Sequence, residues 1–143
     1  MIGRPVEIKK TLSRNDVGDT GSHQAGIHVP KDPSILQFFP LLDKSTKNPR
    51  HVISFWDEAG KEWQFNFIYY NNKIFGGTRN EYRLTCMTPF LKAHNLKAGD
   101  LIKLSRDDFE VKYHVEYTRQ NQEEAVKEGR LQLSLKWMVV KTY

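Results

Sequence analysis

The sequence predicts an all-β fold, a closed or half-closed barrel of about seven or eight strands interrupted by a few short helices. Apolar and polar residues alternate with a period of two in several segments, which is typical of strands with one buried side. Helix-start signals occur only in short stretches. The 143 residues, 38% of them hydrophobic and 12% aromatic, suffice for one domain, residues 1–143, with its own core.

Three segments show the alternation most clearly: 63–69, 109–117 and 131–139. Shorter strands are expected at Val6–Leu12, Ile27–Val29, His51–Trp56 and Leu101–Ser105. Aromatic residues that share the apolar face of a strand could stack on unpaired bases, as in proteins that bind single strands. Core packing is the more ordinary role on such a face. We therefore interpret Trp63, Phe65 and Phe67 as core residues.

Helices are expected where an acidic or hydroxyl cap precedes a proline. Asp32 followed by Pro33 predicts a helix that runs to Phe39 and stops at Pro40. Thr88 is the expected cap of a second helix, Thr88–His94. A third helical turn is expected at Gln122–Glu128, before a glycine.

Composition narrows the class of protein. No apolar run is long enough for a membrane span, and the start lacks the apolar stretch of a signal peptide. The single cysteine, Cys86, excludes an internal disulfide, so we expect a small buried side chain in a cytoplasmic protein. The net charge of +5 favours a polyanionic partner. The chain ends directly after a strand pattern, as a domain cut from a longer protein would.

Two polar loops carry side chains that suit base recognition. In residues 13–24 these are Arg14, Asn15, Asp16, His23 and Gln24, with glycines that let the backbone approach a surface. In residues 71–83 they are Arg79, Asn80, Glu81 and Arg83. Arginine pairs with guanine, asparagine with adenine, and glutamate accepts from the cytosine amino group. A long hairpin loop and a solvated turn are the ordinary alternatives.

Parts of the chain resemble a known family. Leu12–Asp16 with Thr20–Pro30, and Tyr69–Asn72 with Phe75–Gly76 and Thr78–Glu81, closely resemble the N-terminal effector domains of EcoRII-like type II restriction endonucleases. The stretch Leu91–Asp100 resembles a segment of the related plant B-three DNA-binding pseudobarrels. Together these stretches cover about half of the chain.

This resemblance implies an open β-pseudobarrel that grips the major groove of double-stranded DNA with two arms, at about residues 13–31 and 71–85. It also implies a 5′-CC(A/T)GG-like site, probed by one domain per site, and a nuclease domain elsewhere in the same prokaryotic polypeptide. No cofactor is expected for this domain, and Mg²⁺ only for the nuclease domain. The chain departs from the family pattern at Gly77, where a basic residue is expected, and at Cys86-Met87, where arginine and an aromatic residue are expected.

The expected contacts with DNA fall into two groups. Base edges would be read by Arg14, Asn15, Asp16, His23, Gln24, Arg79, Asn80, Glu81 and Arg83. The phosphate backbone would be held by Lys31, Asn72, Lys73, Thr78 and Tyr82. No catalytic or metal-binding residue is expected, because the five histidines show no paired metal spacing.

Two other functions remain open. A small metal-dependent nuclease could use Asp100, Glu110 and Lys112, since a Glu and a Lys two apart share a strand face. The apolar residues Phe109 and Val111 lie on the opposite face, which indicates that Glu110 and Lys112 belong to the solvated side. A transcription-factor domain with the same fold is the other alternative.

Overall fold

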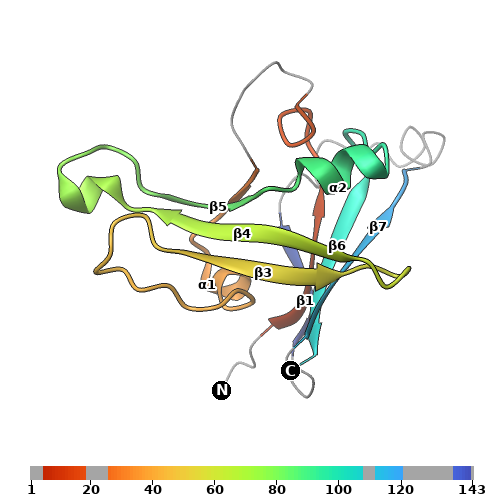
Figure 1. Ribbon diagram of the computed structural model, residues 1–143, viewed down its shortest axis with the longest axis horizontal. Coiled ribbons are helices and arrows are strands. Elements are labelled where there is room, and N and C mark those ends of the chain that lie inside the picture. The colour runs from red at the N-terminus through yellow and green to blue at the C-terminus, as the bar shows by residue number, and fades with distance from the viewer. Residues whose placement is uncertain (1–4, 19–25, 108–111, 121–136, 143) are drawn as a thin grey trace.

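The computed structural model describes residues 5–18, 26–107, 112–120 and 137–142. Strands dominate these residues, with two short α-helices and one 3₁₀ helix (Figure 1). In chain order the elements are β1 (Pro5–Thr11), β2 (Ile27–Val29), α1 (Pro33–Leu36), β3 (Arg50–Trp56), β4 (Glu62–Tyr70), η1 (Asn72–Phe75), β5 (Glu81–Thr85), α2 (Thr88–Ala93), β6 (Leu101–Asp107), β7 (Lys112–Thr118) and β8 (Trp137–Thr142).

The strands form one eight-stranded sheet in the order β2-β5-β4-β3-β7-β6-β1-β8. Neighbouring strands are antiparallel except β3 and β7, which pair in parallel through Phe55–Tyr113 and Trp56–His114. That short parallel ladder joins two groups of strands that cross: β3, β4 and β5 run across the view in Figure 1, while β1, β6 and β7 run steeply through it. The sheet thus curls around its own apolar face, and the predicted all-β pseudobarrel is confirmed.

A side chain joins the two outermost strands of the sheet. The indole Nε1 of Trp137, at the start of β8, donates a hydrogen bond of 2.9 Å to the carbonyl oxygen of His28 in β2. Trp137 is 7% exposed. Since β2 and β8 stand at opposite ends of the strand order, this bond closes the barrel where the described strands form no ladder.

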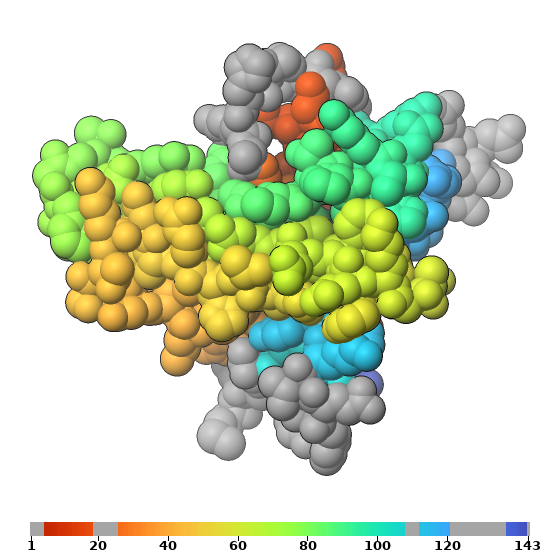
Figure 2. Space-filling view, in the orientation of Figure 1, coloured from red at the N-terminus to blue at the C-terminus, as the bar shows by residue number. Residues whose placement is uncertain are grey.

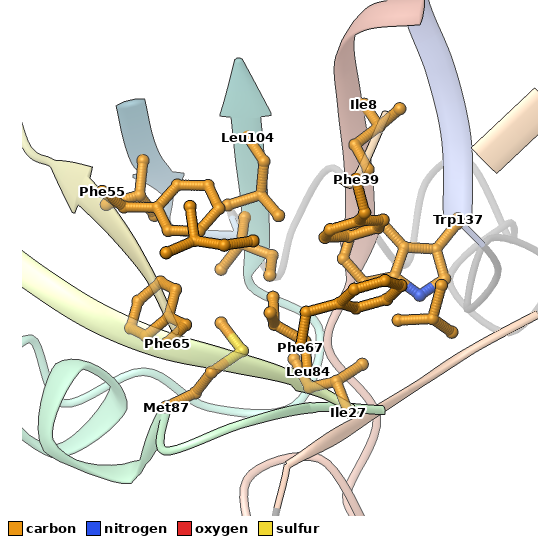
Figure 3. Packing of buried hydrophobic residues seen from close by; sticks show 14 of the residues in the cluster. Ile8, Ile27, Phe39, Phe55, Phe65, Phe67, Leu84, Met87, Leu104 and Trp137 are labelled. Carbon is orange, nitrogen blue, oxygen red and sulfur yellow. The ribbon is translucent and has the colours of Figure 1, made fainter. Parts of the chain in front are cut away.

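Aromatic and aliphatic side chains together fill the space inside the barrel (Figure 3). Phe39, which follows α1, stacks on Phe67 of β4 with ring centroids 4.4 Å apart, and meets Trp137 edge-on at 6.2 Å. Trp63, Phe65 and Phe67 are all buried in this cluster. Their interpretation as core residues is therefore confirmed, and stacking on bases is excluded for them.

Most of the predicted strands are present, with bounds that differ by a few residues. One strand, β5, was not predicted, because residues 71–83 were interpreted as a single loop. Residues 109–111 of one predicted strand and 131–136 of another lie outside the described residues, as does the helical turn expected at Gln122–Glu128.

Of the two predicted helix caps, Asp32 is confirmed and Thr88 is not. Asp32 caps α1, with its Oδ1 accepting from the backbone N–H of Ser34 at 3.0 Å, but the helix ends at Leu36 rather than Phe39. The prediction that Thr88 caps α2 is wrong. Thr88 is already the first helical residue, and Met87 holds the cap position without a side-chain hydrogen bond.

The expectation that Cys86 is buried is also wrong, since its side chain is exposed. Cys86 has a positive φ of 65°, which ends the alternation of β5 and turns the chain toward α2. The adjoining Met87, 1% exposed, enters the core instead.

The described residues contain no helix long and apolar enough to cross a membrane.

Candidate nucleic-acid interface

Residues 13–31, which we call the first arm, begin with a compact turn at the end of β1. The carboxylate of Asp16 accepts from the backbone N–H of Ser13 at 3.0 Å, and the Ser13 hydroxyl accepts from the N–H of Asp16 at 3.1 Å. Lys10 forms an ion pair with the same carboxylate, and both side chains are only 8% exposed. The carboxylate of Asp16 therefore holds the turn that starts the first arm. The base contact expected for Asp16 stays a prediction.

Other polar residues of the first arm lie at the surface. Arg14 and Asn15 are exposed in the turn, and Lys31 is exposed just after β2. His23 and Gln24 lie outside the described residues. At the base of the arm is a cavity of about 520 Å³, lined among others by Asn15, Asp16 and Trp137.

Residues 71–85, which we call the second arm, are anchored by a residue that sequence reasoning missed. Asn71 is fully buried between β4 and η1. Its Nδ2 donates to the carbonyl of Thr46 at 2.8 Å, and its Oδ1 accepts from the backbone N–H of Asn48 at 2.7 Å. These bonds hold the start of the second arm against the 43–48 loop. The only signal in the sequence was an Asn-Asn pair directly after a strong strand.

The turn at the end of the second arm explains the departure at Gly77. The backbone N–H of Gly77 donates to the carbonyl of Asn72 at 2.7 Å, and Gly76 has φ of 91°. A Cβ at Gly77 would lie 2.8 Å from the Cβ of Asn72, closer than side chains pack. A basic residue at this position would force the turn open. The glycine at position 77 is therefore the residue that this turn accommodates.

Charged side chains form a row where the second arm enters β5. Arg79 Nε donates to Glu81 Oε1 at 2.8 Å, and Arg83 Nε approaches the same oxygen at 3.4 Å. The Arg79 guanidinium also lies 3.7 Å from the ring centre of Tyr70, a cation–π contact. Burial raises the pKa of Glu81, but the hydrogen bond from Arg79 and the charge of Arg83 outweigh it and hold that pKa below its usual value.

The three charged side chains of this row differ in their exposure to solvent, and only an exposed one can contact a ligand. The side chain of Arg79 is 42% exposed, that of Glu81 25%, and that of Arg83 only 7%. Arg83 Nη1 donates to the carbonyl of Gly26 at 3.2 Å, which ties β5 to the end of the first arm. Arg79 can thus reach a ligand. The hydrogen bond of Arg83 instead connects the second arm to the first arm at Gly26.

The backbone approach at Gly26 is unusually close. Gly26 has φ of 85°, and a Cβ there would lie 2.3 Å from the carbonyl oxygen of Leu84 in β5. Only glycine allows β2 to start this near to β5.

The remaining expected DNA contacts occupy different environments. Tyr82 is 7% exposed and stacks on Tyr69 with centroids 4.2 Å apart, so its ring belongs to the core. Asn80 Oδ1 accepts from the Tyr69 hydroxyl at 2.7 Å. Lys73 and Thr78 are exposed at the end of the arm, and Asn72 is half-buried. Lys73 and Thr78 thus remain reachable for phosphates.

Asp100 and Lys112, two residues of the alternative nuclease site, are far apart in the fold. Asp100 accepts from the backbone N–H groups of Lys97 and Gln120 at 2.8 and 2.9 Å. It precedes the Leu101 end of the β6–β7 ladder, whereas Lys112 pairs with Asp107 at the other end, about 20 Å away at strand spacing. Glu110 lies outside the described residues. No group of three potential metal ligands occurs in the part of the chain that the structure describes.

Comparisons with known proteins identify a family that the chain matches and proteins that are similar to it. A family described as "Restriction endonuclease EcoRII, N-terminal" matches residues 5–133. The type II restriction enzyme EcoRII of Escherichia coli is 38% identical over 82 residues, which are 53% of this chain and 19% of the enzyme. Auxin response factor 10 of Oryza sativa is 33% identical over 105 residues, which are 73% of this chain and 14% of that protein. The chain therefore spans less than a fifth of the length of these relatives.

Two structures from Arabidopsis are among the solved structures that share the fold. In the Arabidopsis FUS3–DNA complex the similarity has a TM-score of 0.61 at 24% identity, and covers 79% of this chain and 96% of that one. In the Arabidopsis thaliana LEC2–DNA complex it has a TM-score of 0.56 at 20% identity, and covers 79% and 92%.

Proposed function

The chain belongs to the family of EcoRII N-terminal domains, and from this premise we propose that it recognises a short sequence in double-stranded DNA. The two arms would enter the major groove, where base pairs differ in their pattern of donors and acceptors. A curated relative is a restriction enzyme, and the solved relatives are DNA complexes. These descriptions support DNA as the ligand of this chain.

The observation that carries the proposal is the fixed guanidinium of Arg79. It stands at the exposed end of the second arm, is hydrogen bonded to Glu81, and stacks on Tyr70. A guanidinium held in this way has already lost much of its rotamer freedom before binding. Arginine with two donors toward guanine is the commonest specific contact in protein–DNA complexes.

The first arm would contact a second part of the site through Arg14 and Asn15. Figure 2 shows the second arm at the upper left and the described start of the first arm, in red-orange, near the top. The arms are unlike in sequence and structure, so each would take a different half of the site. One domain per site then suffices, without the two-fold dimer of many regulators.

We further propose a target like 5′-CC(A/T)GG, and a nuclease domain elsewhere in a longer restriction endonuclease. The family resemblance supports this target, and Arg79 with Glu81 suits a G·C pair. Mg²⁺ would be required by that nuclease domain only. Plant transcription regulators share the fold, but the family match over residues 5–133 favours the restriction-enzyme context.

A selection from randomised duplexes tests the proposal directly. We expect the bound pool to converge on one short site, and binding to that site to depend steeply on salt. If about five phosphates are neutralised, log affinity should fall against log salt with a slope of roughly −4 to −5. A pool without consensus, or equal affinity for single strands, would contradict recognition through the groove.

The chain by itself should not cleave DNA with Mg²⁺ or Mn²⁺. Asp100 is engaged by backbone N–H groups and stands at the opposite end of the β6–β7 ladder from Lys112, so the two cannot hold one metal. Incubation of supercoiled plasmid with excess protein, read on a gel, measures this. Nicking that disappears in Glu110→Ala would instead support the nuclease alternative.

A further inference from the structure

The end of the second arm carries two large apolar side chains in solvent. Ile74 is 62% exposed and Phe75 46% exposed, and they are adjacent in η1. A single exposed apolar residue is common in proteins. Here two adjoining ones stand between the exposed Lys73 and Arg79, on a segment that otherwise presents polar groups.

The backbone that carries Ile74 and Phe75 is held by hydrogen bonds. The N–H of Ile74 donates to the carbonyl of Asn71 at 3.0 Å, and the N–H of Lys73 donates to the carbonyl of Arg79 at 2.9 Å. In a 3₁₀ helix successive side chains are about 120° apart, so Ile74 and Phe75 cover adjoining sides of the turn. Their exposure is a property of an ordered turn, and little backbone freedom is left to lose on binding.

The ligand that fits an apolar surface on such an arm follows from the chemistry of the major groove. The base edges there present donors and acceptors, and the C5-methyl of thymine is the apolar group among them. We propose that Ile74 and Phe75 contact the C5-methyl of a thymine, at a base pair close to the one that Arg79 reads. This inference rests on the proposed recognition of duplex DNA by the second arm.

The contact would add sequence specificity that the charged residues cannot provide. Lys73 and Arg79 attract any duplex through its phosphates, whereas a methyl group marks one base. Removing one buried methyl group from such a contact should weaken binding about four-fold. An effect of this size is measurable at single base pairs of a selected site.

Replacing thymidine by deoxyuridine isolates the methyl group, because thymine and uracil differ only in the C5-methyl. In the duplex selected from the randomised pool, each thymine in turn is replaced by deoxyuridine, and affinity is measured by competition. For the unmodified chain we expect about four-fold weaker binding at one or two positions. For the double variant Ile74→Ser, Phe75→Ser we expect equal affinity for the thymine and deoxyuridine duplexes. The variant itself should bind the thymine duplex more weakly.

A matched control separates this effect from a general loss of surface apolarity. Val52 is 55% exposed on β3, a strand that belongs to neither arm, and Val52→Ser should retain the discrimination of the unmodified chain. Thermal unfolding of both variants checks the fold, and near-unchanged midpoints are expected because the substituted side chains are exposed.

Several results would overturn the inference while leaving the proposed function intact. These are equal affinity for every deoxyuridine duplex, discrimination that persists in the double variant, and a selected site of G·C pairs alone. A dimer of the unmodified chain in sedimentation that the double variant abolishes would also overturn it, since the pair would then serve self-association. Failure of the proposed function looks different, because no consensus site is then selected at all.

Discussion

Arg79→Ala should weaken binding to the selected site by about 1–3 kcal/mol, roughly five- to 150-fold, and relax the preference at one base pair. Alanine removes the guanidinium that Glu81 and Tyr70 hold in place. It also leaves Glu81 with less compensation for its charge. A glutamate is ionised near neutral pH even at its ordinary pKa, so in the variant this carboxylate repels nearby phosphates.

Competition titrations against the selected duplex and its single-base mismatches measure this effect. Lys73→Ala is the matched control, since Lys73 is an exposed cation on the same arm. It should weaken every duplex nearly equally and reduce the salt slope by about one. Glu81→Gln should cost less on random DNA, or even strengthen binding there, because a negative charge is removed. If Arg79→Ala weakens all duplexes in parallel, as expected for Lys73, then Arg79 is a phosphate anchor and our assignment is wrong.

Trp137→Ala should destabilise the protein by about 3–5 kcal/mol, the usual cost of truncating a large buried aromatic residue. For a chain of this size the melting temperature would fall by roughly 6–20 °C. Trp137 contributes ring packing against Phe39 as well as the hydrogen bond to His28. Its loss would therefore affect both the core and the junction between β2 and β8. Thermal and denaturant unfolding of the variant measure the effect.

Two substitutions separate these contributions. Trp137→Phe keeps an aromatic ring but removes the Nε1–H donor, so we expect a smaller loss, of about 1–3 kcal/mol for an unsatisfied carbonyl and poorer packing. Val140→Ala, on the same strand at 45% exposure, should change stability by less than about 0.5 kcal/mol. A Trp137→Ala variant as stable as Val140→Ala would show that the barrel does not depend on this closure.

The pattern of the sequence predicted the strands whose one face is apolar and whose other face meets solvent. It missed β5, although Tyr82 and Leu84 alternate there with Arg83 and Thr85. All four are buried, because Arg83 bonds to Gly26 and Thr85 Oγ1 donates to Asn66. In the sequence the polar side chains of this short strand continue the polar run that precedes it, so the segment resembles a loop. Their burial depends on hydrogen-bond partners outside the strand.

The structure describes the environment of the predicted site residues, and the contacts with DNA stay predictions. Arg14 and Arg79, one from each polar loop, are exposed, as a contact with DNA requires. Asp16 and Tyr82 share the residue types of a DNA contact, but an ion pair with Lys10 occupies the first and aromatic stacking buries the second. The role of Asn71 depends on the 43–48 loop, more than twenty residues earlier, and no local pattern reports such a partner.

The sequence by itself determined the all-β class, the core side of the regular strands, the acidic cap of α1 and the two polar segments, because these follow from periodicity and residue type over a few neighbours. The family resemblance drawn from its motifs is confirmed by the match over residues 5–133. Only the tertiary structure decided that Trp137 closes the barrel, that Arg83 joins the two arms, and that Cys86 faces solvent. Each of these depends on which distant backbone group comes within hydrogen-bond reach or on a positive φ at a turn, and neither is encoded in the alternation of apolar and polar residues.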